Sequence, residues 1–244
     1  LRNSVNEQNQ FGIISKLDFQ VNEYLNMNVG LDWRTAWIEH FREVRDLLGG
    51  DYYLPRTAQA SEFWDGGNGS RLYLGDKVDY HTTNTVDWLG LFAQGEYKNG
   101  PVTAFGVYGF STIEYGHEDH FRRAAAGSSE TFKLNPGADD GHQIKGGLNY
   151  KLSEQFSVYG NAGWVSKVPI FDGVIDDVTG RLIQSDNEVF TSFETGLRWE
   201  SSDRTFNISA NIFATQWRDR TITDFGRDAN DDDYIIYMRG VDSD

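Results

Sequence analysis

Runs of alternating apolar and polar residues, joined by connections that are alternately short and long, limit most strongly what this chain can fold into. In the clearest run, 144–152, the even-numbered residues are apolar or glycine and most odd-numbered residues are polar. The alternation restarts at Phe156, after a polar turn at 153–155, and returns at 193–199. A period of two indicates β-strands with one apolar and one polar face. Soluble β-sandwiches alternate as well, so the connections have to distinguish the two architectures.

The connections fall into two classes that follow one another strictly along the chain. Tight turns are expected at 22–24, 98–101, 153–155 and 201–204. Long connections are expected at 39–84, 114–142, 167–187 and 218–233. Residues 1–9 are polar without a pattern, and we allow a helical turn or two over 39–48. Eight strands and the start of a ninth are predicted at 10–21, 25–38, 85–97, 102–113, 143–152, 156–164, 188–200, 205–217 and 234–241.

This order predicts an all-β, antiparallel up-and-down transmembrane β-barrel segment. Outer-membrane barrels have short turns on the periplasmic side and long loops outside, whereas a Greek-key sandwich would not sort its connections so cleanly. The longer predicted strands also exceed the roughly 9–11 residues that cross a bilayer at a tilt. For the strand at 102–113 the sequence does not decide which side is apolar, because odd-numbered and even-numbered positions both carry apolar residues.

Aromatic residues gather where such strands would meet the two membrane surfaces. Amphipathic rings form girdles at these interfaces in outer-membrane barrels, although ordinary hairpins are flanked by aromatics too. Near the expected short turns lie Tyr24, Tyr97, Tyr150, Phe156, Trp199 and Phe206. Near the other strand ends lie Trp33, Trp37 and Trp164.

Composition narrows the function classes. The 244 residues carry a formal net charge of −15, a balance that disfavours nucleic acid as a partner. There is no cysteine, which excludes disulfides, thiolate metal sites and a cysteine nucleophile. No apolar run reaches the ~18 residues of a transmembrane helix, which leaves a barrel open as the way of crossing a membrane.

Residues 146–172 resemble the barrels of TonB-dependent outer-membrane receptors. The family commonly carries a segment of the type G-L-N-Y-K-L-S-x-x-F-S-V-Y-x-N, followed by K-x-P-x-F-D. This chain has GLNYKLSEQFSVYGN at 147–161 and then Lys167, Pro169, Phe171 and Asp172. A later E-x-G-L-R-W strand matches at 194–199. The motif likeness covers about 145–217, and the strand pattern covers most of the chain.

The resemblance implies a larger barrel, 22-stranded in this family, with an N-terminal plug domain inside it. We therefore expect residues 1–244 to be a partial barrel domain of eight to nine strands, without the plug. The implied location is the bacterial outer membrane, and the implied partners are membrane lipid, a small-molecule substrate and the TonB complex, reached through other parts of the receptor. The implied function is binding and import of a scarce substrate, a siderophore or a saccharide, with a ferric siderophore foremost.

In such receptors the outer loops and upper lumen capture the ligand. Aromatic rings stack on catecholate or sugar faces, and arginines pair with anionic groups. Packing of the loops on each other is an equally good explanation of these side chains. The residues expected to contact substrate are Tyr52, Tyr53, Trp64, Tyr73, Tyr80, Arg122 and Arg123.

Catalytic and metal motifs give little support to other functions. No nucleophile elbow, phosphate loop or His-Glu-x-x-His motif occurs, so no catalytic residue and no cofactor is expected. We interpret His117 to His120 as a solvated loop rather than a metal site. Asp228, Asn230 and Asp232 have the opening spacing of a calcium loop, but Asp233 and Arg239 replace the required Gly and Glu.

Two alternative functions remain open. An outer-membrane barrel enzyme, such as a protease or lipase, would need converging catalytic groups, and only His117, Asp119 and His120 offer any. A soluble β-sandwich binding module would behave as a water-soluble protein without detergent.

Overall fold

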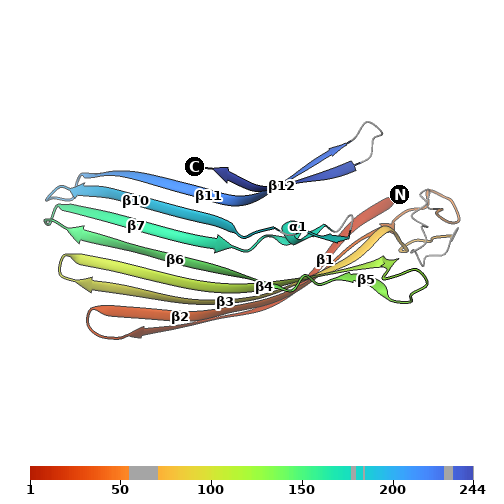
Figure 1. Cartoon of the computed structure of the whole chain (residues 1–244), viewed down its shortest axis with the longest axis horizontal. Coiled ribbons are helices and arrows are strands. Elements are labelled where there is room, and N and C mark those ends of the chain that lie inside the picture. The colour runs from red at the N-terminus through yellow and green to blue at the C-terminus, as the bar shows by residue number, and fades with distance from the viewer. Residues whose placement is uncertain (55–70, 177–179, 184, 228–232, 244) are drawn as a thin grey trace.

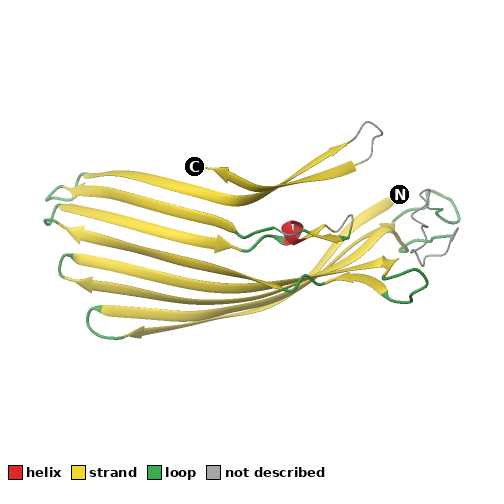
Figure 2. Ribbon diagram, in the orientation of Figure 1, coloured by secondary structure: helices red, strands yellow, loops and turns green. Residues whose placement is uncertain are grey.

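The computed structural model describes residues 1–54, 71–176, 180–183, 185–227 and 233–243. These residues form one 10-stranded antiparallel sheet, elongated along its strands, and a small 2-stranded sheet (Figures 1 and 2). In the main sheet the strands are β1 (Arg2–Gln20), β2 (Leu25–Val44), β3 (Lys77–Asn99), β4 (Val102–Arg123), β5 (Thr131–Leu134), β6 (Ala138–Lys151), β7 (Phe156–Lys167), β10 (Glu188–Glu200), β11 (Asn207–Arg227) and β12 (Asp233–Ser243).

Sheet order follows chain order, as an up-and-down topology requires. The path runs β1-β2-β3-β4-β6-β7-β10-β11-β12, and β5 pairs with the C-terminal end of β4. Among the described residues, β1 pairs only with β2 and β12 only with β11, so the sheet does not close on itself. No helix in this described part has the length and hydropathy to cross a bilayer.

The register joins the predicted apolar residues into one continuous face. Leu148 pairs with Ala104 on one side and with Gly160 on the other, and Leu197 pairs with Val158. On the other side of the sheet Glu194 pairs with Asn161. We call these the apolar face and the polar face. The register also settles the facing of β4, because its even-numbered residues share the apolar face.

Glycines on the polar face allow neighbouring side chains to lie flat on the sheet. A Cβ on Gly147 would lie 2.5 Å from the ring of Phe105 and 2.2 Å from the amide oxygen of Asn161. A Cβ on Gly196 would lie 2.7 Å from the ring of Tyr159. The glycines thus make room for the large rings of Phe105 and Tyr159 on the polar face.

The strands are longer than predicted at the ends that meet the long connections. β1 begins at Arg2 although residues 1–9 show no pattern, and β2 continues to Val44 where helical turns were allowed. Likewise β4 reaches Arg123 and β11 reaches Arg227, inside two of the expected loops. In the central part of the strands apolar residues alternate with polar ones, and we call this zone the apolar belt. The extensions lie beyond it, and both of their faces carry polar residues. Backbone pairing continues there while the period of two in hydrophobicity is lost, so these predicted ends were wrong.

The main hydrophobic core lies on the polar face. The segment after β7 turns back over the sheet, through α1 (Phe171–Val174) and β8 (Ile175–Asp176), which pairs with β9 (Arg181–Leu182). We call residues 168–176 the strap. Its Val168, Val174 and Ile175 pack against Ile113 and Tyr115 of β4, and the Tyr115 hydroxyl donates to the Pro169 carbonyl at 3.1 Å.

Candidate ligand-binding surface

A bulge at the start of β3 shapes the polar face at the long-connection end. Phe41 of β2 pairs with His81, whereas the next residue, Arg42, pairs with Val78. Asp79 and Tyr80 are therefore left out of the ladder, and Asp79 has a φ of 69°, in the left-handed region. Bulges of this kind re-aim side chains and are frequent beside functional sites.

The two bulged residues both contact Arg42. The Asp79 carboxylate accepts a hydrogen bond from Arg42 at 2.9 Å, and the Arg42 guanidinium lies 5.1 Å from the centre of the Tyr80 ring. Arg2 of β1 donates to the same carboxylate oxygen, Oδ2 of Asp79. Two cations and one carboxylate thus form a group with a net charge of +1, which we call the Arg2–Asp79–Arg42 triad.

An open hollow of about 600 Å³ lies beside the triad. Arg2 and Arg42 line it together with Leu1, Ser4 and Tyr53. Arg2, Ser4 and Arg42 share the polar face, because Ser4 pairs with Arg42 and both strands alternate regularly. The hollow therefore offers guanidinium, hydroxyl and phenol groups to a ligand on this side of the sheet.

Several of the predicted contact residues lie near this hollow, and others do not. Tyr53 lines it and is tied by a backbone bridge to Leu72, while Tyr80 stacks on Arg42. Tyr52 is occupied by Arg71, whose guanidinium lies 4.5 Å from the ring centre. Tyr73 is exposed next to Asp76, which accepts its backbone N–H at 2.7 Å. Trp64 lies outside the described residues.

Arg122 and Arg123 form a separate group at the β4–β5 hairpin. The Arg122 guanidinium lies 4.0 Å from the centre of the Phe132 ring and so close to Gly180 that a Cβ there would lie 2.1 Å from Nη1. Arg123 donates to the Ser129 carbonyl at 3.0 Å. The contacts of these two arginines favour a role in packing the loops on each other, which the sequence analysis gave as the alternative to substrate binding.

Sequence reasoning missed Arg2, Arg42 and Asp79. Arg2 and Arg42 lie in stretches taken as patternless or irregular, and Asp79 owes its position to the bulge. An available signal was the shared parity of Arg34 and Arg42, which places both on the polar face once β2 is known to continue.

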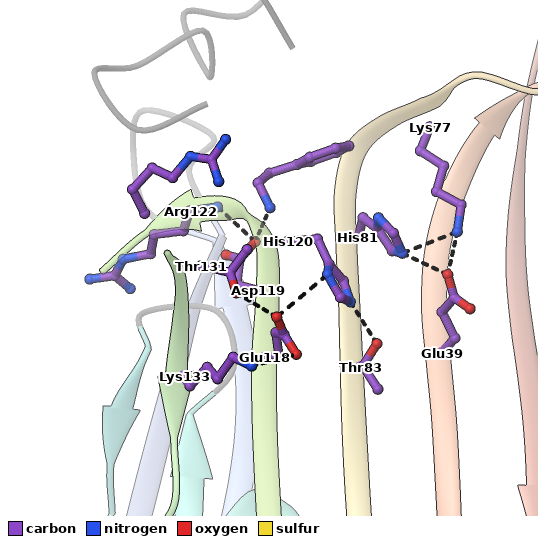
Figure 3. A network of polar contacts seen from close by, with 12 residues as sticks. Glu39, Lys77, His81, Thr83, Glu118, Asp119, His120, Arg122, Thr131 and Lys133 are labelled. Atoms are coloured by element: carbon purple, nitrogen blue, oxygen red, sulfur yellow. Dashed lines mark hydrogen bonds and ion pairs between the residues drawn. The ribbon is translucent and has the colours of Figure 1, made fainter. Parts of the chain in front are cut away.

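A second polar network lies on the other side of the same strands (Figure 3). Glu39 accepts from Lys77, and the His81 Nε2 lies 2.6 Å from the same carboxylate oxygen and 3.0 Å from the Lys77 ammonium. The rings of His81 and His120 are 4.1 Å apart, and Thr83 bonds His120 at 2.7 Å. These polar residues lie on the same side of the sheet as the apolar face. They begin at the Glu39–Thr83 pair and extend toward the long connection between β2 and β3.

Burial and ion pairing set the protonation of this network. Burial lowers the pKa of His81, and the charges of His120 and Lys77 lower it further, against the opposing bond to Glu39. The hydrogen bond from Lys77 lowers the pKa of Glu39. Burial raises the pKa of Glu118, but bonds from Thr131 and Lys133 outweigh it and leave this pKa lowered. A neutral His81 beside the Lys77–Glu39 ion pair is thus the favoured state at neutral pH.

The alternation of β4 separates the histidines that the sequence had placed in one loop. His117 is buried on the polar face and bonds Asn84 at 2.7 Å, whereas His120 faces the opposite side. One metal ion cannot be shared across a sheet in this way. Within the described ranges, no group of three or more His, Asp or Glu side chains is arranged to hold a metal ion. Asp228, Asn230 and Asp232 lie outside those ranges.

The chain matches one protein family, and its fold is similar to those of several solved structures. The family described as "TonB dependent receptor-like, beta-barrel" matches residues 2–242. The copper transporter OprC superposes over 99% of this chain with a TM-score of 0.64 at 11% identity. The ferric-catecholate import receptor Fiu from E. coli K12 superposes over 99% with a TM-score of 0.52 at 12% identity.

The two superposed structures share the fold of this chain at 11% and 12% sequence identity. At such identities they show the fold alone. The chain spans 34% of the length of OprC and 34% of that of Fiu, about a third in each case. No curated protein matches this sequence.

Proposed function

Because the chain belongs to the TonB-dependent receptor β-barrel family, we propose that it is part of a receptor that binds a scarce small molecule outside the cell and imports it. The match of the family over residues 2–242 carries this proposal. The polar face then lines the barrel interior and the apolar face meets lipid, as in other outer-membrane barrels. The location we propose is the bacterial outer membrane.

The whole receptor's activity depends on regions beyond this segment of wall. We propose that a plug domain and the contact with the TonB complex are supplied by other parts of the receptor. The 244 residues would contribute four short periplasmic turns, the adjoining barrel wall and part of the ligand-binding vestibule. Transport by this route needs no covalent chemistry, so we propose a receptor and not an enzyme.

A ferric siderophore is the substrate we favour. The hollow lined by Arg2, Arg42 and Tyr53 combines two cations with an aromatic ring, and the Tyr80 ring lies against Arg42. Such a surface suits an anionic chelate with aromatic or carboxylate groups. A saccharide would use the same aromatic rings by stacking and remains the second substrate class. Tyr53 and Tyr80 are the predicted contact residues that the geometry favours, together with Arg2 and Arg42.

Uptake by cells that lack the receptor gene tests the proposal. Parent and deletion strains are compared for uptake of iron-55 in several siderophores, of copper ions and of radiolabelled oligosaccharides, under limitation for each nutrient. Loss of siderophore-borne iron uptake, restored by the intact gene, is the expected result. Equal uptake of every solute by both strains would contradict an import function.

Surface labelling tests the proposed orientation. Single cysteines are introduced into the full receptor at Ser128, in the β4–β5 turn, at Asn99, the last residue of β3 before a short turn, and at Ser202, in another short turn. The 244 residues contain no cysteine of their own. A membrane-impermeant maleimide added to intact cells should label position 128 and leave 99 and 202 unlabelled until the outer membrane is opened. Labelling of the short turns in intact cells would reverse the orientation.

A further inference from the structure

The two-residue bulge in β3 allows Arg42 to contact both Asp79 and Tyr80, which a regular ladder would not allow. With regular pairing, Asp79 and Tyr80 would alternate between the two faces, and they could not both approach the same guanidinium. The bulge instead brings both of them to Arg42, at the edge of the hollow. The left-handed φ of 69° at Asp79 is a conformation in which aspartate is tolerated better than most residues.

The exposures of the triad show which groups a ligand can reach. The Asp79 side chain is 15% exposed, whereas those of Arg2 and Arg42 are 44% and 33% exposed. Both arginines line the hollow, whereas Asp79 is not among its lining residues. Each guanidinium gives one Nη1 to the shared Asp79 oxygen, which leaves other N–H donors on each of them.

We propose that the Arg2–Asp79–Arg42 triad sets the charge selectivity of this receptor, with Asp79 as an internal counter-ion to two ligand-binding arginines. This inference rests on the proposed receptor function and deepens it: the three side chains would select, by charge, chelates that present carboxylate or catecholate oxygens and carry a net negative charge, and Asp79 would moderate their affinity. One carboxylate for two guanidiniums leaves a single positive charge, so the empty site is partly neutralised yet still attracts an anion. Ser4 and Tyr53 complete the hollow with hydroxyl donors.

The triad predicts opposite effects for its two kinds of member. Arg42→Gln removes a cation that faces the hollow, so an anionic chelate should bind about tenfold more weakly or worse. Asp79→Asn removes the competing carboxylate at nearly constant shape. It should make the same chelate bind about five- to tenfold more tightly, with a steeper salt dependence.

Binding to the full receptor purified in detergent tests this inference. The probes are the iron(III) tris-complex of 2,3-dihydroxybenzamide, a trianion, and ferrioxamine B, a cationic trihydroxamate. Binding is followed by quenching of intrinsic fluorescence at several salt concentrations. Arg34→Gln is the matched control, because Arg34 lies on the same face of β2 and is paired bidentately with Asp32 at 2.8 and 2.6 Å, away from the hollow. Melting temperatures of all variants report folding.

The expected result is binding of the trianion in preference to the cation, weakened by Arg42→Gln, strengthened by Asp79→Asn and unchanged by Arg34→Gln. Weaker binding in Asp79→Asn, or equal losses in the Arg34 and Arg42 variants, would overturn the inference. So would preference for the cation, or no binding of the trianion. These outcomes leave the import function standing, since that depends on solute uptake by parent and deletion strains.

Discussion

The ring of Phe92 lies directly over Gly30 of the neighbouring strand, where a Cβ would come within 2.2 Å of it. The two residues are paired across β2 and β3 on the polar face. The same Cβ would lie 2.7 Å from the Ser15 carbonyl oxygen, a backbone atom that cannot swing away. Gly30 therefore gives Phe92 a place against the sheet that no other residue type would leave free.

We expect Gly30→Ala to weaken the barrel wall, by about 1–3 kcal/mol as for other overpacked sites. Heat-induced loss of the compact form on a gel should occur at a lower temperature in the variant. Gly106→Ala is the matched control, because Gly106 is also a strand glycine and a Cβ there meets nothing within 4 Å. Equal thermal shifts in the two variants would show that the Phe92 contact is unimportant.

Substitution by arginine should distinguish the two faces of β6. Leu148→Arg points a cation toward lipid, at a cost of about 2–4 kcal/mol near the bilayer midplane, whereas Asn149→Arg points it into a wet interior. The amount of receptor inserted in the outer membrane should fall in the first variant and stay near the parent level in the second. Equal insertion of both variants would contradict the facing given by the register.

Packing of the strap should depend on Ile175 and not on Ile170. Ile175 is 1% exposed in the core under the strap, while Ile170, in the same segment, is 60% exposed. We expect Ile175→Ala to cost about 2–5 kcal/mol of local stability, since it opens a cavity, and Ile170→Ala to cost little. Hydrogen exchange of the α1 and β8 amides measures this difference. Equal protection in both variants would contradict a packed strap.

Acid should loosen the His81 network in two steps. The pKa of His81 is lowered in the folded protein, so the unfolded segment binds more protons, and stability falls as pH decreases below the ordinary histidine value of about 6.5. The carboxylates of Glu39 and Glu118 have lowered pKa values too, so their contribution is lost only below their ordinary pKa of 4.5. The network lies beyond the apolar belt, where protons from the medium reach it.

Hydrogen exchange of β4 amides near His120, measured from pH 8 to pH 5 and corrected for intrinsic exchange, tests the first step. Protection should decrease toward pH 5 in the parent and lose most of this dependence in His81→Gln. His142→Gln is the control, because His142 contacts Tyr108 at 3.2 Å, away from the network. An unchanged pH dependence in His81→Gln would exclude His81 as its source.

Sequence reasoning found the parts of the fold in which each strand has one apolar and one polar face. Turns and facing follow from the period of two wherever one side of a strand is apolar and the other polar, as at Leu148 and Leu197. It failed where both sides meet water: the end of β2 at Val44, the start of β1 at Arg2 and the extension of β4 to Arg123. There the hydrogen bonds of the backbone maintain the strand, and no side-chain pattern records them.

The candidate site was only partly predictable for a related reason. Tyr53 and Tyr80 were identified by residue type, but Arg42 needed the true length of β2 and Asp79 needed the bulge. A bulge changes which residues meet without changing composition, so local sequence gives little sign of it. Arg122 was expected to contact substrate, and its proximity to Gly180 joins segments that are distant in the chain, which local sequence does not reveal.

In the receptor that we propose, the extension of paired strands well past the apolar belt affects how the protein can change over generations. Its entrance is walled by backbone hydrogen bonds, which any non-proline side chain permits, so the wall keeps its shape while residues on either face are exchanged. New ligand preferences can then arise from substitutions such as those at the triad positions, without redesign of the membrane-embedded part. The entrance is thereby separated, as a unit of variation, from the portion that must satisfy lipid.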